Sequence, residues 1–184
     1  MGTSAEPVRL ALRKLWSDHV IWTRAYIVAA VAGTPDADAA AGRLLKNQED
    51  IGAAIVPYYG QGAGDKLTEL LKQHIMIAVD LVTAAKAGDD AAFATHDARW
   101  TANIREISAF LAGGNPNWPE NDVFDLLSLH LKLTKDEAVA RLTSDWAADV
   151  KAFDDIFTEI LVVADTLHDG LAAQFPDRFA LVPA

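Results

Sequence analysis

Apolar residues recur every three or four positions along most of this chain of 184 residues. This is the period of a helix that buries one face, and no run alternates apolar and polar residues for long enough to predict a strand. In the first such stretch, one helical stripe consists of Leu12, Leu15, His19, Trp22, Tyr26 and Ala29. The pattern therefore predicts an all-α protein in which a histidine occupies the place of a core residue.

Turn-forming residues divide the first two thirds of the chain into helical segments of similar length. Glycine- and proline-containing turns at residues 33–35, 60–64 and 87–89 separate four predicted helices. Short connections between helices of similar length indicate antiparallel neighbours, as in an up-down helical bundle. We predict four main helices, followed by a short helix and a long C-terminal helix. Together they form a single helical-bundle domain over residues 1–184 without an internal repeat.

The last third of the chain has a less regular pattern. A proline-punctuated loop covers residues 113–122, and Trp118 within it is expected to cover one end of the bundle. A short helix is predicted over residues 122–131. The Thr-Lys-Asp-Glu string that starts at Thr134 matches a capping box and predicts the start of the C-terminal helix, with a break near Thr143.

The composition excludes several classes of function. Sixteen basic and 26 acidic residues give a formal net charge of −10, and the basic residues are scattered singly, so nucleic acid is not expected as a partner. The absence of cysteine excludes disulfides, thiolate catalysis and iron–sulfur ligation. No stretch approaches the roughly 20 apolar residues of a membrane span, and no leader peptide is visible. We therefore expect a cytoplasmic protein without a membrane partner.

Polar side chains interrupt the apolar stripes of several helices. His19, His74 and His130 each lie on such a stripe, and a buried imidazole needs a hydrogen-bond partner, a metal ion or a ligand. The rise of a helix is about 1.5 Å per residue, so heights in the bundle can be counted from the turns. This count places Gln48 and Asn103 at the same height as His19 and His74.

Two carboxylates complete a predicted set of metal ligands. Glu49 lies beside Gln48, and rotation of its helix by one position would turn it to the centre. Asp149 shares its helix face with apolar residues, so it needs a partner such as His130, His19 or a cation. Imidazole and carboxylate groups that converge in a bundle are ligands of iron, manganese or zinc. We therefore predict a transition metal site formed by His19, Glu49, His74, His130 and Asp149.

A hydrogen-bonded core without metal is an alternative for the same residues. A single histidine on an apolar face is commonly bonded to a carboxylate or a carbonyl group. Gln48, Glu49 and Asn103 could complete a buried polar network that fixes the helix register. Neither the Glu-x-x-His pair of di-iron bundles nor the HExxH motif occurs in the sequence. A purely structural bundle, including a homodimer, is therefore kept as a hypothesis.

Five strings that lie between residues 15 and 142 carry a family resemblance. They are LWSDHVIWTR, LLKNQEDIG, LLKQHIMIAVDLV, NPNWP and HLKLTKDEAVARL. On these strings the chain resembles a group of small bacterial all-helical proteins with no established activity. The resemblance implies an all-helical fold and assigns no role to any residue.

These observations predict a metal-binding helical bundle. If the protein is an enzyme, iron-dependent redox or oxygen chemistry at the buried site is the expected class of reaction. The alternative is a non-catalytic module that binds haem, a small apolar ligand or a partner protein. The expected partner is a metal ion or a small molecule. No catalytic residue can be named from the sequence, which leaves open whether the protein is an enzyme.

Overall fold

The computed structural model describes residues 5–179, and residues 1–4 and 180–184 of the predicted domain lie outside them. The described part of the chain contains helices and no strand, which confirms the all-α class. The helices are α1 (Ala5–Ala32), α2 (Ala37–Tyr59), α3 (Gln61–Ala87), α4 (Asp90–Gly114), α5 (Glu120–Leu142), α6 (Trp146–Gln174) and α7 (Pro176–Phe179).

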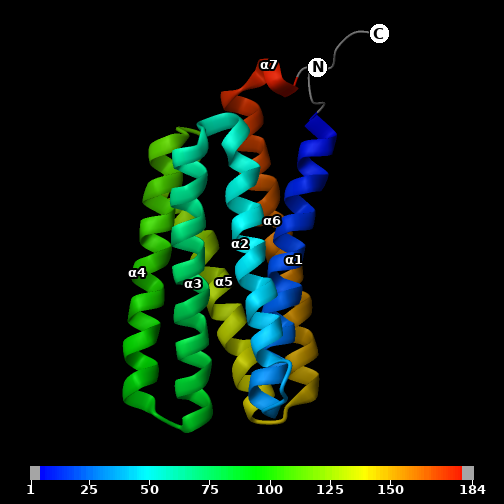
Figure 1. The fold of residues 1–184 in the computed structure, drawn as a ribbon, viewed down its shortest axis with the longest axis vertical. Helices are drawn as coiled ribbons and strands as arrows, with labels where there is room; N and C mark the ends of the chain where they lie inside the picture. The colour runs from blue at the N-terminus through cyan, green and yellow to red at the C-terminus, as the bar shows by residue number, and fades with distance from the viewer. Residues whose placement is uncertain (1–4, 180–184) are drawn as a thin grey trace.

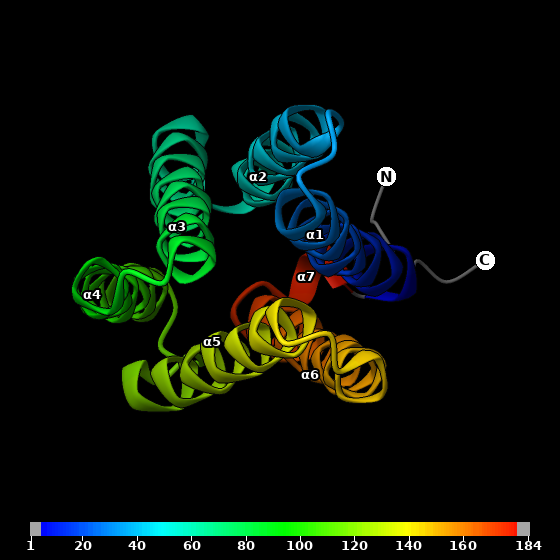
Figure 2. The ribbon, with the colours of Figure 1, turned by 90° about the horizontal axis from the view of Figure 1, so that it is seen from below.

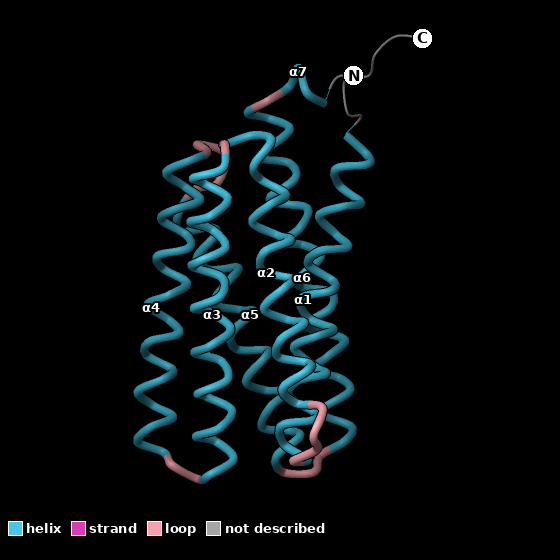
Figure 3. Tube along the Cα trace, viewed as in Figure 1, coloured by secondary structure: helices cyan, strands magenta, loops and turns pink. Residues whose placement is uncertain are grey.

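The six long helices run up and down beside one another, so that α1, α3 and α5 share one direction and α2, α4 and α6 the other (Figure 1). Seen along the bundle axis, they form a ring in chain order, which closes because α6 packs against α1 (Figure 2). Helices α1, α3 and α5 also contact one another. The loops that join the helices are short (Figure 3). The up-down bundle is therefore confirmed, and it has six long helices.

Helix α5 differs from the prediction for the last third of the chain. We expected a short helix over residues 122–131 and a new helix from Thr134, whereas α5 is continuous over Glu120–Leu142. Thr134 lies inside this helix, and its hydroxyl donates to the carbonyl oxygen of His130 instead of capping a helix start. A cap is worth about 1 kcal/mol, which is less than the gain from burying a continuous apolar stripe.

The predicted break near Thr143 is confirmed. Ser144 adopts the left-handed conformation with a φ of 61°, and α6 begins two residues later. The side chain of Asp145 caps α6 by accepting a hydrogen bond from the backbone nitrogen of Ala148 at 3.1 Å. Helices α5 and α6 therefore form a third helical hairpin, after α1 with α2 and α3 with α4.

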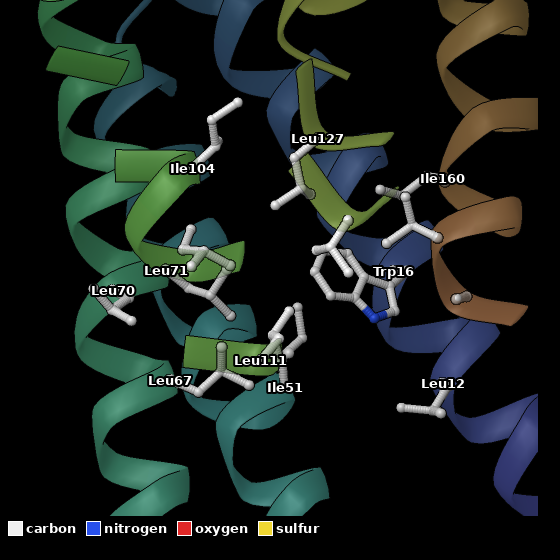
Figure 4. Packing of buried hydrophobic residues seen from close by; sticks show 14 of the residues in the cluster. Leu12, Trp16, Ile51, Leu67, Leu70, Leu71, Ile104, Leu111, Leu127 and Ile160 are labelled. Atoms are coloured by element: carbon white, nitrogen blue, oxygen red, sulfur yellow. The ribbon is translucent and has the colours of Figure 1, made fainter. Parts of the chain in front are cut away.

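An apolar core runs along the inside of the ring and receives side chains from all six long helices. Figure 4 shows part of it, with labels on Leu12, Trp16, Ile51, Leu67, Leu70, Leu71, Ile104, Leu111, Leu127 and Ile160. Full burial of a leucine or isoleucine side chain stabilises the fold by about 1.5–3 kcal/mol, so this core dominates the stability. None of the described helices has both the length and the apolar character needed to cross a membrane.

Trp118 covers the end of the core next to α7, as predicted. It lies in the loop between α4 and α5, is 2% exposed, and donates from its indole nitrogen to the carbonyl oxygen of Thr166 at 3.2 Å. A Cβ atom on Gly170 would lie 1.9 Å from the same indole nitrogen. The glycine therefore allows the ring to lie directly against α6.

A second close approach joins α2 to α3 at Gly52. A Cβ atom there would lie 1.9 Å from the hydroxyl oxygen of Thr68 and 2.6 Å from the backbone oxygen of Gly64. The backbone oxygen cannot move aside without shifting α3. The absence of a side chain at Gly52 thus sets the distance between the two helices.

The substitution Gly52→Ala should therefore lower the free energy of unfolding by about 1–3 kcal/mol, since it forces α2 away from α3. Gly42→Ala is the matched control, because Gly42 lies in the same helix and its Cβ atom would have no neighbour within 4 Å. This control should raise the free energy of unfolding by about 0.5–1 kcal/mol. Urea denaturation measures both, and equal stabilities would contradict the close packing.

Candidate metal centre

Three buried histidines converge halfway along the bundle. His19 on α1, His74 on α3 and His130 on α5 come from the three helices that share one direction. The ring centroids of His19 and His130 are 5.4 Å apart, and each lies 6.3 Å from that of His74. One ring nitrogen of each histidine lies within 4.8 Å of one nitrogen of each of the others. We call these three residues the histidine triad.

A partner on the following helix holds the Nδ1 atom of His74 and of His130. The Nδ1–H of His74 donates to Oδ1 of Asn103 at 3.0 Å, and the amide of Asn103 donates to the carbonyl oxygen of Leu70 at 3.1 Å. The Nδ1–H of His130 donates to Oε2 of Glu159 at 3.1 Å. Both rings therefore carry their proton on Nδ1 and keep the Nε2 lone pair for a ligand.

His19 has a different partner and a different tautomer. Its Nδ1 atom lies 3.3 Å from Nε2 of Gln48, and that amide nitrogen also donates to the carbonyl oxygen of Leu44 and to Oδ1 of Asn47. These two acceptors identify the amide nitrogen as a donor, so Nδ1 of His19 accepts by sharing one of its two N–H groups, and the proton of His19 lies on Nε2. The Oε1 atom of Gln48 is buried and has no hydrogen-bond partner among the described residues. If the amide of Gln48 turned, its Oε1 atom could accept a hydrogen bond from Nδ1–H of His19. The proton of His19 would then lie on Nδ1, and its Nε2 would be free to bind a ligand.

Burial keeps His19 and His74 neutral. Desolvation, together with repulsion from His130, lowers the pKa of His74 from 6.5 to about 3. Desolvation and repulsion from His130 and His74 also lower the pKa of His19 well below its ordinary value. Neutral imidazole is the form that binds metal ions, so these two rings have the charge state of metal ligands at neutral pH.

Two apolar cavities meet at the triad, because all three histidines line both. The larger, about 840 Å³ when open solvent at its edge is counted, extends to Trp118, and we call it the Trp118 cavity. The smaller, about 470 Å³ on the same basis, extends to Tyr26 and Ala138. Only a small part of either space is wide enough for a water molecule, so both cavities are narrow.

The two predicted carboxylate ligands do not reach the triad. Glu49 has a side chain that is 44% exposed and accepts a hydrogen bond from Lys72 at 2.6 Å. It follows Gln48 by one position, which turns it about 100° away from the centre. Asp149 is buried, but it pairs with Arg24 at 2.9 Å and with Arg141 at 3.0 Å. The partner that it was expected to need is therefore a cation, and the predicted five-residue site reduces to the three histidines.

Glu159 was not among the predicted site residues, although a spacing in the sequence indicates it. Each partner follows its histidine by 29 residues, and the three histidines follow one another at intervals of 55 and 56 residues. The strings LWSDHV, LLKQHI and LLSLHL share a leucine four positions before the histidine, an apolar residue three positions before it and an apolar residue directly after it. The expectation of no internal repeat is therefore wrong for these residues, since three hairpins place histidine and partner in the same way.

No protein-family model, curated protein or solved structure matches this chain. The resemblance to small bacterial helical proteins therefore stays a prediction. Residue roles have to be argued from the geometry of the chain itself.

The lowered pKa of His74 predicts how the stability of the metal-free protein depends on pH. Between about pH 6.5 and pH 3 the unfolded state binds a proton at this residue and the folded state does not, so the stability falls as the pH falls. The lowered pKa of His74 alone should make the free energy of unfolding about 2 kcal/mol smaller at pH 5 than at pH 7.

His74→Gln is the comparison, because it removes the titrating ring and leaves all other titrating residues in place. Urea denaturation at pH 7 and pH 5 should show a smaller loss of stability in this variant than in the natural protein, by about 2 kcal/mol. The same loss in both proteins would mean that His74 is protonated in the folded state.

Proposed function

We propose that this protein binds one divalent transition metal ion through the Nε2 atoms of His74 and His130 and, once the amide of Gln48 has turned and the proton of His19 lies on Nδ1, through Nε2 of His19. The observation that carries the proposal is the convergence of three buried rings, each with Nδ1 held by a side chain of the next helix. Partners of this kind orient the histidine ligands of metal sites. Bonds of about 2.1 Å from a metal ion place its ligand nitrogens about 3.4 Å apart. From separations within 4.8 Å in the triad, the ligand nitrogens therefore have to approach by at most about 1.4 Å.

The ligand set favours some metals over others. Imidazole nitrogen suits zinc, iron and copper, whereas manganese prefers oxygen ligands. With Glu49 and Asp149 paired to cations elsewhere, the triad offers nitrogen alone. Of the predicted metals, iron and zinc thus have more support than manganese.

Three protein ligands leave coordination positions open, and an open position is typical of catalytic metal sites. The open positions would lie next to the two apolar cavities, where little water has access. With bound iron, such a site suits redox or oxygen chemistry, and with zinc it suits activation of a bound oxygen ligand. We therefore keep iron-dependent redox or oxygen chemistry in the proposal. Separately, we propose a cytoplasmic location.

Binding of a small apolar ligand is the second candidate function, since the Trp118 cavity offers an apolar wall. Haem has less support. Ring nitrogens of three histidines that lie mutually within 4.8 Å leave no room between them for a porphyrin plane. A homodimer or another protein partner stays a prediction.

Single substitution of a triad residue tests the proposal. His74→Ala should abolish retention of the metal, because it removes one of three ligands and leaves Asn103 without its donor. The measurement is metal content by mass spectrometry of tag-free protein after incubation with zinc or iron and removal of the excess. Near-stoichiometric metal is expected in the natural protein, and less than a tenth of that in the variant.

His96→Ala is the matched control, since His96 lies on α4 outside the triad, beside Arg99 and Asp80. It should retain metal as the natural protein does. Circular dichroism establishes that both variants are folded. Unchanged metal content in folded His74→Ala, or no metal in the natural protein, would overturn the proposal.

A change in the partner of His130 should weaken the site without removing a ligand. Glu159→Gln keeps an oxygen that can accept from Nδ1–H but removes the negative charge, so we expect a 10- to 100-fold loss of metal affinity. Glu49→Gln is the control, since Glu49 pairs with Lys72 away from the triad, and its affinity should be unchanged. Competition with a chelating dye measures both. A loss caused by Glu49→Gln and not by Glu159→Gln would contradict the assignment.

A further inference from the structure

We infer that the Trp118 cavity binds a small monocarboxylate with an unbranched apolar chain, whose carboxylate end meets the metal ion at the histidine triad. This inference deepens the proposed metal site, on which it rests for the position of the carboxylate. It assigns a class of ligand or substrate to the site.

The shape of the cavity favours an elongated apolar molecule. The cavity begins at the triad and continues along α1 from His19 past Trp16 to Leu12, a distance of about 10 Å at the rise of a helix. Trp118 and Leu171 line its other end. Its walls consist almost wholly of aliphatic and aromatic side chains, so they favour an extended hydrocarbon chain over a polar molecule.

The charge of the site favours an anionic end group. No lysine or arginine lines the Trp118 cavity, and Glu159 is the one carboxylate that bonds to a triad histidine within the described range of 5–179. A divalent ion at the triad would therefore keep excess positive charge in an apolar interior. One monoanionic ligand at its open position balances that charge, because buried charges require a partner.

The test uses the full chain loaded with cobalt(II), whose visible absorption reports a change of coordination. Acetate, butanoate, hexanoate, octanoate and decanoate are titrated in turn. Each added CH₂ group should raise the affinity about fourfold while it enters the cavity. The affinity should then level off or fall for the longest chains, which exceed the distance to Trp118.

Two variants locate the ligand. Leu111→Phe narrows the cavity near Trp118 and should weaken octanoate binding at least tenfold, whereas Leu10→Phe at an exposed position of α1 should leave it unchanged. Circular dichroism confirms that each variant is folded.

The outcomes separate this inference from the metal proposal. If cobalt binds and the affinity does not rise with chain length, the inference is overturned and the metal site stands. If cobalt does not bind, the metal proposal and the carboxylate position both fail. Calorimetry with uncharged octan-1-ol then tests whether the cavity takes an apolar ligand. If octan-1-ol binds and Leu111→Phe weakens its binding, an apolar ligand in this cavity is supported. If octan-1-ol does not bind, the apolar ligand is overturned as well.

Discussion

Three imidazole rings buried along one bundle each need a hydrogen-bond partner, and this need constrains how the helices pair. A buried polar group without a partner costs about 1–3 kcal/mol. In each hairpin the second helix supplies the partner, namely Gln48, Asn103 or Glu159, at the height of the histidine on the first helix. The turn between the two helices sets that height. A slip of one helical turn in any hairpin would leave the histidine without this partner inside the core.

The repeated hairpin also explains why the interior can hold a ligand. The histidines of α1, α3 and α5 reach the centre from three sides, so an ion between them is surrounded by similar donors. Apolar side chains fill the levels on either side of the triad, where the two narrow cavities lie. Charges interact strongly in such surroundings because the local dielectric constant is low. The charge of a bound ion and of Glu159 would therefore govern which molecules enter.

A second cluster of buried polar side chains, made of arginines and carboxyl groups, lies nearer the other end of the bundle. Arg24 on α1 bridges Glu137 on α5 and Asp149 on α6, and Arg141 also pairs with Asp149. Burial raises the pKa of Glu137 to about 7, although Arg24 opposes this shift. Hydrogen bonds from the two arginines outweigh desolvation and lower the pKa of Asp149. Two cations and two carboxyl groups thus satisfy one another and tie three helices together, away from the histidine triad.

The sequence by itself determined the helical class, most helix boundaries and the inward position of the three histidines, because helical periodicity decides which side chains share a face. The tertiary structure decided three things that are not local. Glu49 turned outward and Asp149 met two arginines, since helix rotation depends on packing against neighbours. Helix α5 continued through Thr134, since its buried stripe outweighed a local capping signal. Glu159 became the partner of His130 because α5 pairs with α6. The 29-residue spacing is visible in the sequence, but only the folded hairpin brings the two side chains into contact.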